Sequence, residues 1–216
     1  TAALAVNAYA ITWKIDGASG ELAQNMKLHL DGVDADATPA TQNAAIDDAI
    51  TAAARALGYY QLTWQSKRDN GNIVITVVPG PRVVYDNISL TLTGDGRREQ
   101  PLLDAWQSTP LAKGNSLQHG DYEKFKRRVL EAARGIGYLD AKFAEHLIAV
   151  NTLKNTANVT LTLDTGPAFT INNIVVEGSR LDADLIQTLI PLKKGDRFRA
   201  ENLATLYGGL FDSGYF

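Results

Sequence analysis

The stretch LGYYQLTW (residues 57–64) decides the fold, because it joins an alanine-rich helical pattern to an alternating, strand-like one. Glycine ends a helix in the left-handed conformation at no steric cost, and the tyrosine after it can pack back over the helix. The Gly-Tyr pair recurs in IGYLDAKF (136–143) and in SGYF (213–216). The chain is therefore predicted to hold three copies of a corner at which a helix turns into a strand.

A second marker repeats with a similar spacing. Gly80-Pro81 and Gly166-Pro167 each follow an alternating apolar run and each precede another such run. Two helical patterns lie between these runs, so each unit, here called a module, is expected to run strand, helix, helix, strand, strand. The predicted modules cover residues 10–80, 81–167 and 168–216. The third module lacks its last two strands and is expected to be completed by further chain or by a neighbour.

The helices are placed by caps and by four-residue apolar spacing. Thr38 is a plausible N-cap with Pro39 in the first turn, and Leu22, Met26 and Leu30 form one stripe. The predicted helices are 19–30, one that begins at Thr38, 101–108, 120–138, 182–190 and 199–212, and the opening strands of the modules are 10–17, 83–94 and 168–178.

The order of the strands follows from short connections, which make consecutive elements antiparallel. The third strand of a module then lies parallel to the first and between the other two, giving a mixed sheet of order 1-3-2 with both helices on one face. NIVITVV (72–78) is apolar on consecutive positions, as a central strand should be, and QLTWQSKRDN (61–70) is polar and charged, as an edge should be. The predicted fold class is α+β.

Composition excludes several classes of function. The chain has 216 residues, is 45% hydrophobic and 21% charged, and carries a formal net charge of −3 without any cysteine. This balance favours a globular protein and argues against nucleic acid as a partner. His29, His119 and His146 lack the spacing of a metal site, and no phosphate-binding or nucleophile motif occurs. No enzyme, catalytic residue, metal or cofactor is predicted.

Two further stretches leave alternatives open. Ala8-Tyr9-Ala10 has the form of a signal-peptidase site, or else the start of the chain is an expression scar or an ordinary strand. The basic run at Lys124 and 126–128 is interpreted as a solvated helix face, with acidic partners or lipid headgroups as the alternative. Trp13, Trp64 and Trp106 are interpreted as core or module-junction residues rather than a substrate platform, with the exposed face of the first sheet as the expected packing surface of Trp13 and Trp64.

Taken in order, these markers resemble the POTRA (polypeptide-transport-associated) domains of the Omp85 superfamily, and most of all its TamA-like members. The stretches that carry the resemblance are IDGASGELAQNM (15–26), ALGYYQ (56–61), the run 117–143 and the run from Phe169 to Phe216. The resemblance implies tandem POTRA modules in the periplasm of a Gram-negative bacterium, attached to a C-terminal barrel in the outer membrane.

The resemblance also implies a function and partners. The region would assist insertion of outer-membrane proteins and autotransporter secretion. Its partners would be a TamB-like protein anchored in the inner membrane, nascent outer-membrane proteins or autotransporters, and its own barrel. The alternatives are the POTRA region of a BamA-like or two-partner-secretion transporter, and a structural spacer that binds nothing.

Binding is expected at the edge strands, where an extended peptide can pair with free backbone groups. The second strands of the complete modules, about 60–68 and 141–150, are these edges. Under the alternative interpretation, alternate residues face the module's own helices and the adjoining module covers the rest. The candidate protein-binding residues are Tyr60, Leu62, Trp64, Phe143, Glu145, Leu147 and Ile148.

Overall fold

The computed structural model describes residues 12–34, 37–69, 72–175, 190 and 192–212. The chain divides into two compact units. The first unit contains the described residues up to Ile88 together with 111–122 and 148–158. The second contains 89–110, 123–147 and the described residues from Val159 onward. The division does not follow the predicted module boundaries, which remain a prediction.

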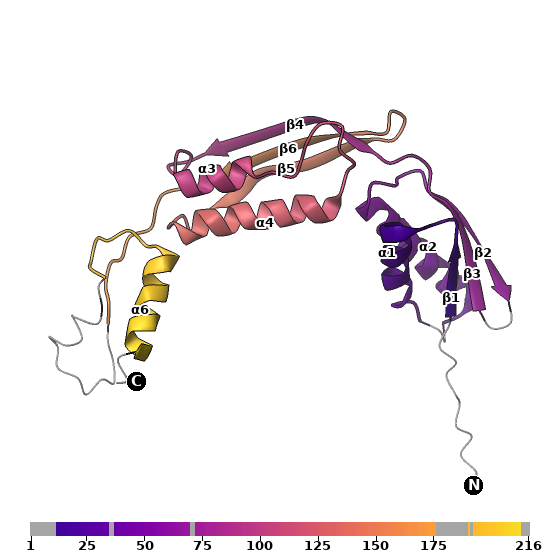
Figure 1. Cartoon of the computed structure of the whole chain (residues 1–216), viewed down its shortest axis with the longest axis horizontal. Coiled ribbons are helices and arrows are strands. Elements are labelled where there is room, and N and C mark those ends of the chain that lie inside the picture. The colour runs from indigo at the N-terminus through magenta and orange to yellow at the C-terminus, as the bar shows by residue number, and fades with distance from the viewer. Residues whose placement is uncertain (1–11, 35–36, 70–71, 176–189, 191, 213–216) are drawn as a thin grey trace, which may run out of the picture. The chain divides into compact units, whose positions relative to one another are not determined.

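The first three-stranded sheet has the predicted topology. Its elements are β1 (Thr12–Asp16), α1 (Gly20–Leu30), α2 (Pro39–Ala56), β2 (Thr63–Asp69) and β3 (Asn72–Val78). The strand order is β1-β3-β2, with β1 parallel and β2 antiparallel to β3. Both helices lie on one face of this sheet (Figure 1). The first module thus positions β2 as an edge strand whose outer side is not paired within the sheet.

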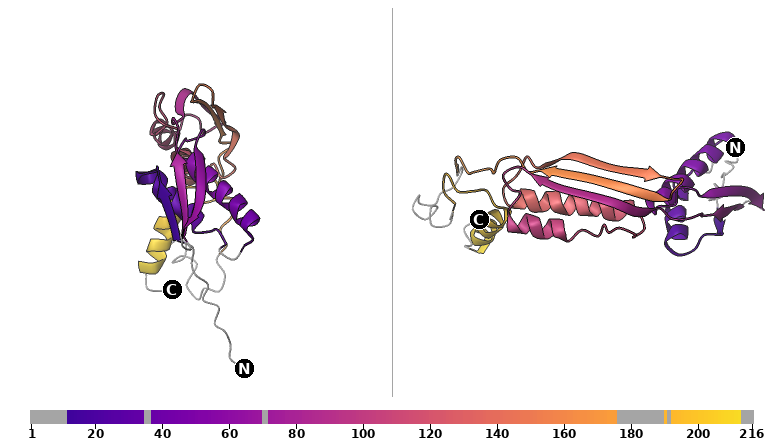
Figure 2. Two further views of the ribbon diagram at one scale, coloured as in Figure 1. Left: turned by 90° about the vertical axis from the view of Figure 1, so that its right-hand side faces the viewer. Right: turned by 90° about the horizontal axis from the view of Figure 1, so that it is seen from above.

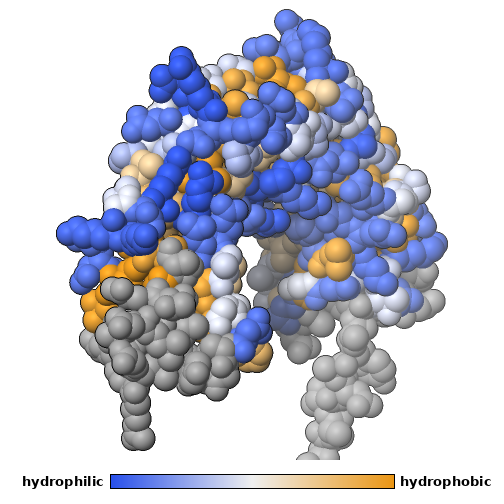
Figure 3. All heavy atoms as spheres, turned by 60° about the vertical axis from the view of Figure 1, so that its left-hand side comes forward, coloured by the Kyte–Doolittle hydropathy of each residue, from blue (hydrophilic) through white to orange (hydrophobic). Residues whose placement is uncertain are grey.

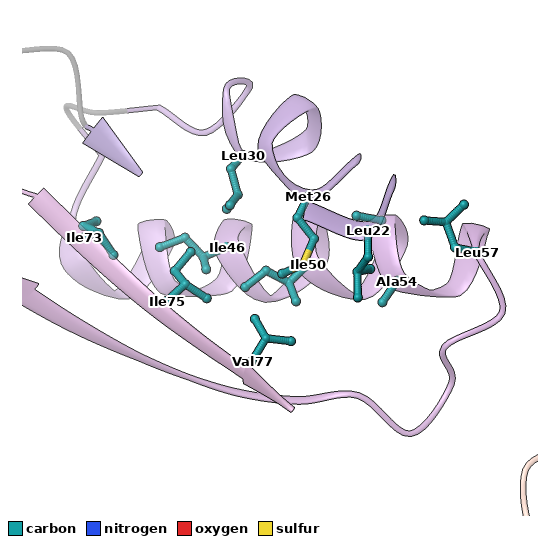
Figure 4. Packing of buried hydrophobic residues seen from close by; sticks show 11 residues of the cluster. Leu22, Met26, Leu30, Ile46, Ile50, Ala54, Leu57, Ile73, Ile75 and Val77 are labelled. Carbon is teal, nitrogen blue, oxygen red and sulfur yellow. The ribbon is translucent and has the colours of Figure 1, made fainter. Parts of the chain in front are cut away.

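The core of the first sheet lies between β3 and the two helices. Period-two alternation turns Ile73, Ile75 and Val77 toward the helices, where each is at most 3% exposed. Figure 4 shows these side chains against Leu22, Met26 and Leu30 of α1 and Ile46 and Ile50 of α2. The predicted cap of α2 is confirmed, because the Thr38 side chain accepts a hydrogen bond from the Thr41 amide.

The second sheet repeats this topology. Its elements are β4 (Val84–Thr93), α3 (Gln100–Gln107), α4 (His119–Gly135), β5 (Lys142–Asn151) and β6 (Thr156–Asp164), in the order β4-β6-β5. Helices α3 and α4 lie on one face of the sheet (Figure 2). The Trp106 and Phe125 rings, 5.7 Å apart, anchor its core. The predicted order 1-3-2 is therefore confirmed for both sheets, and β5 is the counterpart of β2.

The third repeat is described only in part. Helix α6 (Ala200–Asp212) confirms the prediction for 199–212, and its inward residues Leu203, Leu206 and Leu210 are only half-buried. Over residues 168–175 the structure has one isolated bridge, Thr170 with Arg197, so the strand predicted there is wrong for these residues.

Two other predictions about the third repeat fall outside the described residues. They are the helix at 182–190, apart from Ile190, and the third Gly-Tyr corner at 213–216. Figure 3 shows one face of the molecule, on which apolar atoms form patches among larger hydrophilic areas. Among the described helices, none has the length and hydrophobicity needed to cross a bilayer.

Candidate protein-binding strand edges

The edge strand β2 begins later than the sequence suggested. It runs from Thr63 to Asp69, so Tyr60 and Leu62 precede it and only Trp64 of the three candidates lies on the strand. Between Trp64 and Arg68 the strand exposes Gln65, Ser66 and Lys67. The free backbone of β2 is therefore bordered by polar side chains.

Trp64 and Leu62 face inward. Both are partly buried against the core cluster of the first sheet, and the Trp64 indole Nε1 donates to Oδ1 of Asp47 on α2 at 2.9 Å. Trp13 also packs on this cluster, and it lies beside the buried Ile73 in the parallel register. The interpretation of Trp13 and Trp64 as core residues is therefore confirmed, whereas the expectation that they pack on the exposed face of the sheet is wrong.

A charged residue at the other end of β2 also reaches inward. The Arg68 guanidinium donates to the side-chain oxygen of Gln42 on α2, and that amide is only 1% exposed. The Gln42 Nε2 donates in turn to the carbonyl of Asp34 at 3.2 Å. The edge strand therefore supplies a donor to a buried amide.

Tyr60 lies at a contact with the second module instead of on an edge. Its hydroxyl is 2.8 Å from Nε2 of His119, the first residue of α4. The Arg55 guanidinium carbon lies 5.9 Å from the centre of the Tyr60 ring. Burial raises the pKa of Tyr60 above its ordinary value of 10.0, and the positive charge of Arg55 partly opposes this rise. Tyr60 therefore stays a neutral hydrogen-bonding group at neutral pH.

The four candidates on β5 all lie on one edge strand, but they differ in burial. Phe143 is half-buried, with the Lys126 ammonium 5.7 Å from the centre of its ring, and Ile148 is also half-buried. Glu145 is exposed and Leu147 is 53% exposed. Phe143 and Ile148 are five positions apart, so in a regular strand they would point to opposite faces. Leu147 is thus an apolar side chain left in solvent on an edge strand.

Sequence reasoning missed a polar cluster at the start of the third repeat. The Arg197 Nη1 donates to Oε1 of Glu99 at 2.7 Å, and the Tyr138 hydroxyl donates to the same oxygen at 3.3 Å. The Arg197 guanidinium carbon lies 4.7 Å from the centre of the Tyr138 ring. The hydrogen bond from Arg197 holds the pKa of Glu99 below its ordinary 4.5. No local sequence pattern predicts this cluster, because its members are far apart in sequence.

The chemistry at these edges is that of the backbone. A strand edge offers unpaired N–H and C=O groups, which an added strand can satisfy. Within the described ranges no group of three or more His, Cys, Asp or Glu side chains could hold a metal ion. Whether the seven candidate residues bind a protein remains a prediction.

Comparisons with known proteins agree with this architecture. The family model for POTRA domain 1 of TamA matches residues 12–79. The crystal structure of Haemophilus influenzae BamA POTRA3-5 covers 95% of this chain and 85% of its own, with 17% identity and a TM-score of 0.51. POTRA1-3 of the periplasmic domain of Omp85 from Anabaena matches 94% of this chain and 84% of its own, with 15% identity and a TM-score of 0.39.

The match to the family model concerns sequence and covers the first sheet with its two helices. The similarity to BamA POTRA3-5 concerns fold and extends over nearly the whole chain. Residues 12–79 therefore match the model of POTRA domain 1 of TamA, and the chain has the fold of tandem POTRA domains.

Proposed function

We propose that this chain is the periplasmic binding and scaffolding region of a TamA-like outer-membrane protein. It assists insertion of outer-membrane proteins and autotransporter secretion, and it performs no enzymatic step. Its first module docks a TamB-like protein anchored in the inner membrane. The edge strands take up nascent outer-membrane proteins by β-augmentation, in which an extended client pairs with the free side of the strand.

The observation that carries the proposal is the match of residues 12–79 to domain 1 of TamA. The edge strands support the mechanism. Both β2 and β5 lie at the outside of their sheets, and β5 has an exposed leucine next to a half-buried isoleucine. A client strand on β5 would cover Leu147 and satisfy the backbone at the same time.

Two alternative functions have their own support. A structural spacer is favoured by Leu62 and Trp64, whose side chains are used by the module's own core. A BamA-like role is favoured by the fold shared with BamA POTRA3-5.

The test uses a pair of proline variants in β5. Successive backbone N–H groups of a strand point to opposite sides within the sheet. Of Leu147→Pro and Ile148→Pro, one therefore loses a hydrogen bond to β6, and the other loses a donor to the free side. The variant that keeps wild-type unfolding in urea is the one altered on the free side.

Client binding is then measured by photo-crosslinking from Glu145 to a synthetic ten-residue strand of an outer-membrane barrel, with the exposed Glu131 on α4 as the control position. We expect the folded proline variant to lose about tenfold or more in crosslink yield, which corresponds to roughly 1.4 kcal/mol of binding. Equal yields from Glu145 and Glu131 in the wild type would favour the spacer. Unchanged yield in the folded variant would exclude pairing at β5.

A further inference from the structure

The Gly-Tyr corner after α2 contacts the second module directly. The Val83 amide donates to the Gly58 carbonyl at 2.8 Å, and the Leu117 amide donates to the Val83 carbonyl at 2.8 Å. Two more backbone bonds continue this ladder, from Tyr85 to Asn115 at 2.9 Å and from Gly114 to Tyr85 at 2.7 Å. The corner, the chain after Gly80-Pro81 and the segment before α4 therefore form one hydrogen-bonded junction, here called the first junction.

The Gly-Tyr corner after α4 makes the same contacts with the third repeat. The Phe169 amide donates to the Gly137 carbonyl at 2.8 Å, and the Phe198 amide donates to the Phe169 carbonyl at 2.9 Å. The ladder continues from Ile171 to Asp196 at 2.8 Å and from Gly195 to Ile171 at 2.7 Å. This second junction reproduces the first one bond for bond.

Two separate constraints act on the corner glycines. Gly58 and Gly137 have φ values of 85° and 101°, which favour glycine over any L residue. A Cβ on Gly58 would also lie 2.6 Å from the carbonyl oxygen of Leu117, and a Cβ on Gly137 would lie still closer to that of Phe198. Each glycine therefore leaves room for a main-chain atom of the following module.

The same two junctions also contain glycines that have a positive φ but no crowding by a neighbouring carbonyl oxygen. Gly114 and Gly195 have φ values of 86° and 93°, but a Cβ on either would meet nothing within 4 Å. They separate the cost of left-handed backbone from the cost of crowding the next module. Each lies in the same ladder as the corner glycine with which it is compared.

The tyrosine after each corner glycine supports the same interpretation. The guanidinium carbon of Arg82 lies 5.3 Å from the centre of the Tyr59 ring, and that of Arg197 lies 4.7 Å from the centre of the Tyr138 ring. Both arginines come from the chain that follows the corner. At each corner, the glycine carbonyl thus accepts a hydrogen bond from the following chain, and the tyrosine ring lies against an arginine of that chain.

We propose that Gly58 and Gly137 couple consecutive modules: each is a docking point for the next module, and a side chain there parts the two modules while each stays folded. This assigns the Gly-Tyr pair a role that the end of a helix alone does not require. It is independent of any client or partner, because every contact involved lies within the chain.

The experiment compares Gly58→Ala with Gly114→Ala in the complete chain. Trypsin cleavage after Arg82 reports on the junction, because Arg82 donates to the Leu57 carbonyl and the next residue, Val83, is fully buried. We expect cleavage to be about tenfold faster or more in Gly58→Ala, and close to the wild-type rate in Gly114→Ala, since cleavage follows local opening.

A second readout is the rotational correlation time of each module from ¹⁵N relaxation. Coupled modules tumble together, whereas parted modules tumble faster and with different times. Gly58→Ala is expected to show two times, and Gly114→Ala one. Gly137→Ala and Gly195→Ala form the matched pair for the second junction. The proposal would be overturned if both variants of each pair gave the same cleavage rate and the same correlation times. The positive φ of these glycines would then account for the effect of the substitutions without any contact between modules.

Gly58 also ends α2, so Gly58→Ala could unfold the first module. Val83→Pro avoids this, because it removes the amide that donates to the Gly58 carbonyl while the glycine that follows α2 is kept. If Gly58→Ala loses the fold, two correlation times in Val83→Pro support the coupling, and a single time in Val83→Pro overturns it.

Discussion

The two junctions share one backbone pattern but rely on different side chains. At the first junction, Val83 and Leu117 are completely buried. At the second, Phe169 is 38% exposed, Phe198 is half-buried, and the ion pair of Arg197 with Glu99 lies beside them. The difference teaches that the repeat fixes the main-chain contacts, while apolar burial in one case and charge pairing in the other provide the remaining stability.

The largest effect should come from truncating the apolar side chains. Leu117→Ala is expected to cost about 2–5 kcal/mol, because a completely buried leucine leaves a cavity. Phe198→Ala should cost only about 1–2 kcal/mol despite the larger side chain, because less apolar area is removed from water at that position. Urea unfolding followed by tryptophan fluorescence measures both. A cost for Phe198→Ala equal to that of Leu117→Ala would show that the second junction also depends on burial.

A smaller effect should follow from titrating the second junction. Arg197 lowers the pKa of Glu99, with smaller contributions from Tyr138 and Arg199, so the unfolded chain takes up this proton first. The stability from Glu99 is therefore complete above pH 4.5 and is lost as the pH falls through its lower folded pKa. The contribution is about 1–2 kcal/mol for a half-buried, charge-assisted pair.

The control for this titration is Glu99→Gln, which cannot titrate. The difference in unfolding free energy between wild type and Glu99→Gln should be largest at pH 7 and shrink toward pH 3. A difference that stays constant over this range would mean that the ion pair does not stabilise the second junction. The first junction, where Tyr60 faces His119, should show no loss through Glu99.

The smallest effect is expected from the contact between Tyr60 and His119. Tyr60→Phe removes the hydroxyl that lies 2.8 Å from His119 and is expected to cost about 0.5–1.5 kcal/mol. Tyr207→Phe on α6 is the control, because Tyr207 is 69% exposed and its change should stay within about 0.5 kcal/mol. If urea midpoints of the two variants are equal, the Tyr60–His119 contact contributes nothing to the first junction.

The sequence was sufficient to predict the fold because its signals are local and repeated. Helical spacing, the Thr38 cap and the apolar run 72–78 each fix one element, and the Gly-Pro and Gly-Tyr pairs fix their order. Connection lengths then left a single topology. The strand predicted at 168–178 was wrong over 168–175, since an alternating pattern does not by itself supply a pairing partner.

The sites were harder to predict, because they depend on register and on distant partners. Polar composition identified β2 as an edge but could not show that Trp64 faces α2, since a shift of one residue exchanges the two faces. The Gly-Tyr pair was recognised as a corner, but the carbonyl that approaches Gly58 comes from Leu117. Glu99 and Arg197 are separated by 98 positions, which no local pattern spans.

The link between Arg68 and Gln42 has a consequence for the behaviour of the protein at high concentration. An exposed sheet edge is a template on which identical molecules can polymerise, and a charge turned toward the sheet interior is one way to prevent this. Another copy stacking on β2 would have to accommodate a guanidinium that is already committed to a buried amide. The placement of Arg68 thus disfavours the stacking of another copy of the first module on β2.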